Sequence, residues 1–193
     1  MKKSFSIRKI LQALYYLQSK SPCKDKYGKM YLLKLIYFAD RYHLRHFGTV
    51  PSSDNYRAME YGPVASATYD VLKKKMPINA NSSEYELLAF VEEKNENEVE
   101  IKKQSEDELS KSYIQALDFA LTNYGKFDGF RLSKITHLYP DWKKHEKELQ
   151  EGCLQVPMQF VDFFDNPKNV ERDPFEDDDE FLNAMREEYC ELS

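Results

Sequence analysis

The sequence is poor in the residues that mark the common catalytic and metal-binding motifs. Its 193 residues include six glycines and three cysteines, and no two cysteines have the C-x-x-C spacing. It contains no Gly-rich phosphate loop, no G-x-S-x-G nucleophile motif and no H-E-x-x-H zinc motif. These absences argue against an enzyme of a common motif-bearing class, and we expect neither catalysis nor a cofactor.

Long apolar runs are also missing. The longest, from Met30 to Ala39, is interrupted by Lys34 and is too short to cross a bilayer. The basic amino terminus lacks a continuous apolar segment with a small-residue cleavage site, which argues against a signal peptide. The three cysteines are odd in number and far apart, as in proteins of a reducing compartment. We therefore expect a cytoplasmic protein with no membrane partner.

Charge is divided unevenly along the chain, whose net charge is −5. Residues 1–50 carry eleven Lys or Arg against two Asp, a net charge of +9. Residues 171–193 carry ten Asp or Glu against two Arg, a net charge of −8. This asymmetry fits either a nucleic-acid face with an acidic tail or attraction between the two ends of one domain, and we favour the attraction.

Apolar periodicity predicts a mainly α, α+β domain around one central helix at about residues 29–47. That stretch is apolar on nearly every side of a helical wheel, which is typical of a helix covered all round by its neighbours. Gly48 is placed to end it in the left-handed conformation. Further helices are expected over residues 6–20, 63–76, 111–124, 128–136, 142–150, 156–164 and 175–189.

A smaller β component is expected from two β-prone regions. Residues 85–93 and 98–103 flank the turn candidates Lys94-Asn95-Glu96-Asn97 and predict an antiparallel hairpin. Residues 55–60 are a further strand candidate, and they offer the hairpin a third member because isolated hairpins are marginally stable. We divide the chain into a domain over residues 1–164 and an acidic linker with an amphipathic helix over residues 165–193.

His43 and His46 are the best-spaced candidates for a metal site, since they share a helix face and His137 or Asp40 could join them. No accompanying motif supplies the remaining ligands. Surface or capping roles are therefore favoured for both histidines, and no bound metal is expected.

Tyr61-Gly62-Pro63-Val64 is the first stretch with features of a binding site. Glycine followed by proline is typical of a tight entry into a helix. The same turn leaves amide groups that can receive an acidic group of a partner. The structural role is favoured because Gly-Pro entries are common.

The second stretch runs from Thr136 to Trp142 and includes His137 and Pro140. The single tryptophan of the chain fits an interface anchor, because large aromatic side chains dominate binding energies. It fits equally well a core anchor whose indole N–H has one buried partner. The sequence does not decide between these roles.

The chain resembles the Panacea domain, the SocA-like antitoxin family that also occurs in phage-associated proteins. The resemblance spans about residues 7–150 and is carried by three motifs in order: K-L-I-Y-F-A-D-R-Y-H-L, A-M-E-Y-G-P-V-A-S-A-T-Y-D-V-L and L-S-K-I-T-H-x-x-P-x-W. It implies no catalytic residues. The family's marked positions correspond here to Tyr61, Gly62, Pro63, Val64, Thr136, His137, Pro140 and Trp142. Asp141 separates the last two, whereas the family's proline often directly precedes the tryptophan.

This resemblance implies a helical domain that neutralises a toxin encoded nearby, usually by direct protein contact. A proteolytic adaptor that delivers the toxin to a protease and a DNA-binding regulator are the alternatives. DNA is the less expected partner because no docking motif is present. Candidate toxin contacts on the acidic helix are Phe181, Leu182, Met185 and Tyr189, whose neighbouring carboxylates suit a basic groove. The oligomeric state is left open.

Overall fold

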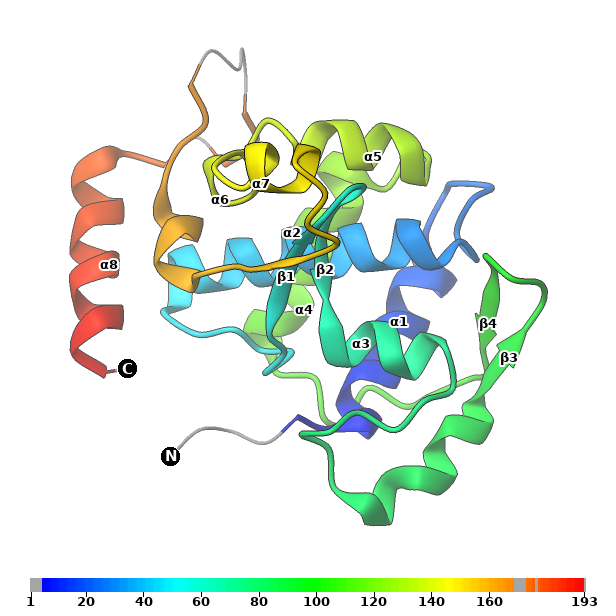
Figure 1. The fold of residues 1–193 in the computed structure, drawn as a ribbon. Helices are drawn as coiled ribbons and strands as arrows, with labels where there is room; N and C mark the ends of the chain where they lie inside the picture. The colour runs from blue at the N-terminus through cyan, green and yellow to red at the C-terminus, as the bar shows by residue number, and fades with distance from the viewer. Residues whose placement is uncertain (1–4, 169–172, 176, 193) are drawn as a thin grey trace.

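Helix α2 (Lys29–Phe47) runs through the middle of the molecule, and the other elements surround it (Figure 1). The structure is a computed structural model that describes residues 5–168, 173–175 and 177–192. Buried side chains occur on every side of α2 because helices and a strand pack against it from several directions. Gly48 ends the helix with a φ of 65°, so the central helix and its left-handed cap are confirmed.

The remaining helices confirm a mainly α fold. Serine and aspartate side chains cap α1, α4 and α5 by accepting hydrogen bonds from backbone N–H groups of the first turn. No helix in the described part of the chain has both the length and the apolar character of a membrane span. The helices are α1 (Ile7–Lys20), α3 (Ser66–Leu72), α4 (Lys111–Tyr124), α5 (Gly129–Thr136), α6 (Pro140–Lys143), α7 (Glu146–Gln150) and α8 (Asp179–Leu192), with 3-10 segments η1 (Ser82–Phe90) and η2 (Phe160–Phe164).

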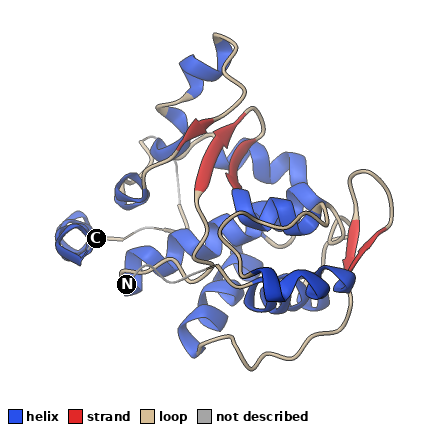
Figure 2. Cartoon of the chain, turned by 60° about the horizontal axis from the view of Figure 1, so that its bottom comes forward, coloured by secondary structure: helices blue, strands red, loops and turns tan. Residues whose placement is uncertain are grey.

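The strands form two sheets that lie apart (Figure 2). The first has the order β2-β1-β5 and joins β1 (Tyr56–Met59) to β2 (Gly62–Ala65) and β5 (Val156–Pro157). The second is the predicted hairpin, formed by β3 (Val91–Glu93) and β4 (Val99–Ile101). The prediction that residues 55–60 join this hairpin is wrong, because β1 pairs with β2 and β5 instead.

The turn between β1 and β2 explains this pairing. Met59 pairs with Gly62, so only Glu60 and Tyr61 connect the two strands. Such a short connection costs little loop entropy, which favours pairing β1 with β2 over pairing it with the distant hairpin. Pro63 therefore lies in an edge strand, where a missing N–H is tolerated, and helix α3 begins at Ser66 rather than at Pro63 as predicted.

Other boundaries also differ from the predictions. Residues 82–90 form a 3-10 segment instead of most of a strand, and Leu88 is the buried residue among them. Residues 156–164 begin as β5 and continue as η2, because Val156 pairs with Ala58 of β1. The helix predicted at residues 142–150 is divided into α6 and α7.

The segment after residue 164 packs against the rest of the chain. Phe175 is 1% exposed, and its ring centroid lies 4.9 Å from that of Phe119 and 6.1 Å from that of Tyr124 on α4. Leu182 of α8 is also buried, and α8 stands at one side of the molecule against η2 and α2 (Figure 1).

Candidate functional site

The two motif stretches meet at one open groove beside α2. The Ser133 hydroxyl on α5 donates a hydrogen bond to the Tyr61 carbonyl at 2.9 Å. The Trp142 indole nitrogen on α6 donates to the Met59 carbonyl of β1, also at 2.9 Å. The groove has a volume of about 1680 Å³ and is lined by both stretches, by the first half of α2 and by the turn of the β3–β4 hairpin.

Gly62 is required where the two stretches touch. Its φ is 98°, a conformation that favours glycine. A Cβ at this position would lie 2.3 Å from Thr136 Oγ1 and 3.2 Å from Lys34 Nζ. Thr136 is itself fully buried and donates to the Ser133 carbonyl at 2.7 Å. The turn and α5 are therefore in direct contact through a position that has no room for a side chain.

His137 and Trp142 form a stacked pair at the groove. Their ring centroids are 3.6 Å apart with 4° between the ring planes, and Trp142 is 3% exposed. Burial and the nearby Lys34 ammonium lower the pKa of His137, so the ring is neutral at pH 7. The neutral His137 ring thus packs on one face of Trp142, and the Met59 carbonyl accepts the indole N–H at its edge.

Asp141, which separates Pro140 from Trp142, is an anchor of this turn. Its side chain is fully buried, forms an ion pair with Arg41 of α2 and accepts hydrogen bonds of 3.0 and 2.9 Å from the Tyr37 hydroxyl. The Asp141 carboxylate therefore ties α6 to the central helix.

Lys34 is the functional candidate that the sequence reasoning missed, since there it only interrupts an apolar run. The side chain is 1% exposed and lines the groove, and its ammonium donates to the Pro63 carbonyl at 2.8 Å. Burial lowers the pKa of Lys34 to about 7. The sequence feature that could have indicated this buried lysine is its position in the apolar centre of the main helix.

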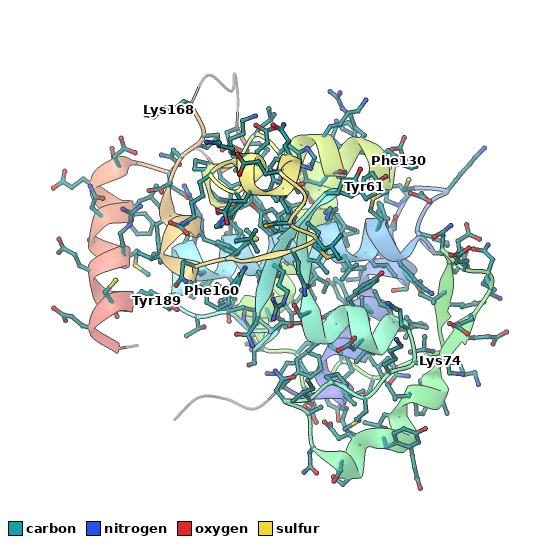
Figure 3. All side chains as sticks on the ribbon, viewed as in Figure 1. Tyr61, Lys74, Phe130, Phe160, Lys168 and Tyr189 are labelled. Carbon is teal, nitrogen blue, oxygen red and sulfur yellow. The ribbon has the colours of Figure 1, made fainter. Side chains whose placement is uncertain are left out.

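Tyr61 and Phe130 form an exposed aromatic pair at the rim of the groove (Figure 3). Tyr61 is 54% exposed and Phe130 is 68% exposed. Their ring centroids are 6.5 Å apart with 86° between the planes, which is an edge-to-face arrangement. Tyr61 and Phe130 thus present aromatic surface where the two motif stretches meet.

A second cluster of buried polar groups binds the carboxyl-terminal segment to α2. Arg45 is fully buried and donates to the Phe163 carbonyl at 3.1 Å, the Phe175 carbonyl at 3.0 Å and the Asp177 carboxylate at 3.0 Å. Arg41 and Arg45 contribute to the positive charge of residues 1–50, but both are buried and paired with acidic groups of the same chain. The contacts fit the attraction between the two ends better than a basic surface for nucleic acid.

The histidines considered as metal ligands have protein partners. His43 Nδ1 lies 2.8 Å from the Thr49 carbonyl, and its Nε2 lies 3.0 Å from Ser112 Oγ. His46 Nε2 lies 3.1 Å from Asp177. Burial disfavours the charged form of His46, but the hydrogen bonds to Asp177 and to the Tyr42 carbonyl, together with the Asp177 charge, outweigh it and raise the pKa. Within the described residues, no three His, Cys, Asp or Glu side chains come together as a metal site would require.

The four candidate toxin contacts on α8 differ in accessibility. Phe181 is 41% exposed, whereas Leu182 is buried. Met185 and Tyr189 are partly buried against the core, and the Tyr189 ring centroid lies 5.9 Å from that of Phe164. Contact of this helix with a toxin stays a prediction, and Phe181 is the side chain best placed for it.

Comparison with known families covers the segment that contains both motif stretches. A family model described as "Antitoxin SocA-like, Panacea domain" matches residues 32–143, which are more than half of the chain. The chain belongs to the SocA-like Panacea antitoxin family. No curated protein and no solved structure matches it. The Panacea segment begins in α2 and ends in α6, so it contains Lys34, both motif stretches and the exposed aromatic pair, whereas α8 lies outside it.

Proposed function

We propose that the protein is an antitoxin that neutralises a cognate toxin by direct protein–protein binding and has no catalytic activity of its own. Membership of the Panacea family, through residues 32–143, is the observation that carries this proposal. The match includes both motif stretches that line the groove. The toxin is the protein partner that this family membership suggests.

The groove and its rim are the surface that suits such a partner best. Tyr61 and Phe130 are exposed aromatic side chains beside an apolar floor, and binding energy in protein interfaces concentrates in aromatic residues. Trp142 ties α6 to β1 beside the turn that carries Tyr61, and Ser133 ties that turn to α5, which carries Phe130, so the fold holds the two rim residues together. A preformed surface loses little entropy when a partner binds.

Co-expression with the toxin encoded beside this chain tests the proposal. Wild-type protein should restore growth and should co-purify with the toxin. Tyr61→Ala and Phe130→Ala should each weaken rescue while leaving the fold intact, since both side chains are mostly exposed. Tyr85→Ala is the matched control, because Tyr85 is 63% exposed on η1 and does not line the groove. Growth arrest that the wild-type protein leaves unchanged would reject the proposal.

Two further measurements refine the mode of neutralisation. A toxin half-life that shortens in the presence of the antitoxin would indicate delivery to a protease, whereas an unchanged half-life would indicate occlusion. Phe181→Ala tests the α8 prediction, because it removes the exposed side chain of that helix while Leu182 keeps the helix packed. Full rescue by this variant would exclude the Phe181 contact and leave the groove as the binding surface.

A further inference from the structure

Lys34 is a buried cation with no counter-ion among the described residues. Arg41 and Arg45, the other fully buried cations of α2, are paired with Asp141 and Asp177. The Lys34 ammonium has three N–H donors, and the Pro63 carbonyl accepts one of them at 2.8 Å. Burial is the one cause that shifts its pKa, so no described carboxylate lies close enough to offset the loss of water.

The fold alone does not account for this charge. The aliphatic stem of Lys34 packs beneath the β1–β2 turn, where a Cβ on Gly62 would lie 3.2 Å from its Cε. A neutral donor would satisfy the Pro63 carbonyl equally well without burying a charge, and unpaired buried charges cost several kcal/mol. Strongly perturbed groups at clefts are more often functional than groups elsewhere. Lys34 lines the groove, so the groove is the side from which a partner would approach it.

The surroundings of Lys34 define the chemistry of that partner. Met59, Val64 and Trp142 supply apolar lining in the same groove as Lys34. Glu60 at the β1–β2 turn and Glu146 on α7 also line the groove, and they repel a carboxylate that enters out of position. The groove therefore suits one carboxylate directed at Lys34 and attached to an apolar body.

We propose that this groove docks a segment of the toxin that places a carboxylate on the Lys34 ammonium and apolar side chains on the floor at Met59 and Trp142. The carboxylate belongs to an Asp or Glu side chain or to the carboxyl terminus of the toxin. Tyr61 and Phe130 cover the segment at the rim. The inference rests on the proposed antitoxin function, because it names the part of the toxin that the antitoxin recognises.

Such docking couples binding to a proton. A carboxylate pairs with the charged form of Lys34, and this form is lost in the free protein as the pH rises above about 7. The dissociation constant should therefore rise about tenfold per pH unit above pH 7 until the pKa of the bound lysine is reached. His137 does not add to this slope, because its lowered pKa keeps the ring neutral there.

Hexanoate tests the site without the toxin, because it joins a carboxylate to an apolar chain. In protein labelled with ¹³C at the lysine Cε, hexanoate should raise the pKa read from the Lys34 resonance, and hexanol should not. The Lys34→Met variant should lose hexanoate binding, whereas Lys74→Met should keep it, since Lys74 is exposed and lies outside the groove. A Lys34 titration that saturating hexanoate leaves unchanged would overturn the inference.

Toxin binding is the second test of the inference. Lys34→Met should weaken toxin binding about thirtyfold or more at pH 7 and should abolish the pH slope, whereas Lys74→Met should change neither. If Lys34→Met does not fold, Phe130→Ala is measured instead. It should weaken toxin binding while keeping the pH dependence of the dissociation constant. If Lys34→Met, or Phe130→Ala where it is used instead, binds the toxin with wild-type affinity, the inference is overturned and the antitoxin function stays in place. A wild-type protein that does not bind the toxin would reject the proposed function, and the hexanoate result then decides the site.

Discussion

His137 lies flat against Trp142, with 3.6 Å between the ring centroids and 4° between the ring planes. His137 follows the end of α5 and Trp142 lies in α6, so the stack fixes the angle between the two helices. The indole nitrogen of the same tryptophan reaches the Met59 carbonyl of β1 at 2.9 Å. One side chain therefore joins both motif stretches of the Panacea segment.

Trp142→Ala should lower the free energy of unfolding by about 3–5 kcal/mol, as expected for a large aromatic side chain that is 3% exposed. Trp142→Phe should cost less, because the ring stays while the Met59 carbonyl loses its donor. Urea unfolding should be followed by circular dichroism, since Trp142 is the only tryptophan and its fluorescence disappears with it. A change within about 1 kcal/mol in Trp142→Ala would mean that the stack does not hold the site.

Gly62→Ala and Gly152→Ala separate backbone strain from steric clash. Gly152 has a φ of 104°, and a Cβ added there would meet no described atom within 4 Å, so its substitution should cost about 1–2 kcal/mol of strain. Gly62 has a similar φ of 98°, but its Cβ would meet Thr136 Oγ1 at 2.3 Å. Gly62→Ala should therefore cost about 1–3 kcal/mol more in urea unfolding. Equal losses in the two variants would contradict the close contact between the turn and α5.

Arg41 and Asp141 should behave as one unit in a double-mutant cycle. Arg41→Met leaves the buried Asp141 carboxylate without its partner and should cost about 3–5 kcal/mol. The double variant Arg41→Met/Asp141→Asn should cost less than the sum of the two single changes, by about 0.5–3 kcal/mol. Strictly additive losses in urea unfolding would show that the two side chains are not coupled.

Lys34 should make the stability of the free protein rise with pH between about 7 and 10.5. In the folded chain its pKa is lowered to about 7, whereas in the unfolded chain it returns to its ordinary value of 10.5. The unfolded state then binds more protons in this range, so the free energy of unfolding increases with pH. The full shift corresponds to about 5 kcal/mol, from about 1.4 kcal/mol per pKa unit.

The check on this linkage is a comparison of wild-type protein with Lys34→Met in urea unfolding at pH 7, 8 and 9. The variant removes the uncompensated charge, so its stability should exceed that of the wild type at pH 7, and the difference should shrink as the pH rises. Parallel pH profiles for the two proteins would show that folding does not lower the pKa of Lys34.

The sequence was sufficient for features that depend on neighbouring residues. The apolar run of α2, its cap at Gly48 and the hairpin β3–β4 follow from periodicity and turn residues over short distances. The pairing of β1 with β5 was not predictable in this way, because Ala58 and Val156 meet only through the tertiary fold. Local alternation identifies a strand but does not name its partner.

The candidate site shows the same division. Tyr61–Val64 and Thr136–Trp142 were singled out from the sequence, but their contact through Gly62 and Thr136 depends on how α5 packs. The role of Lys34 was missed because a lysine in an apolar run gives no sign of whether a carboxylate lies nearby. Its burial and its hydrogen bond to the Pro63 carbonyl are properties of the packed domain.

Titration of purified toxin with the purified protein, without any protease present, tests the antitoxin function most directly. Toxin activity should fall in proportion to the protein added and reach its minimum at a fixed molar ratio, because direct binding needs no other component. The Tyr61→Ala and Phe130→Ala variants should require more protein for the same inhibition, and Tyr85→Ala should match the wild type. Toxin activity that stays constant at a molar excess of folded wild-type protein would contradict neutralisation by direct binding.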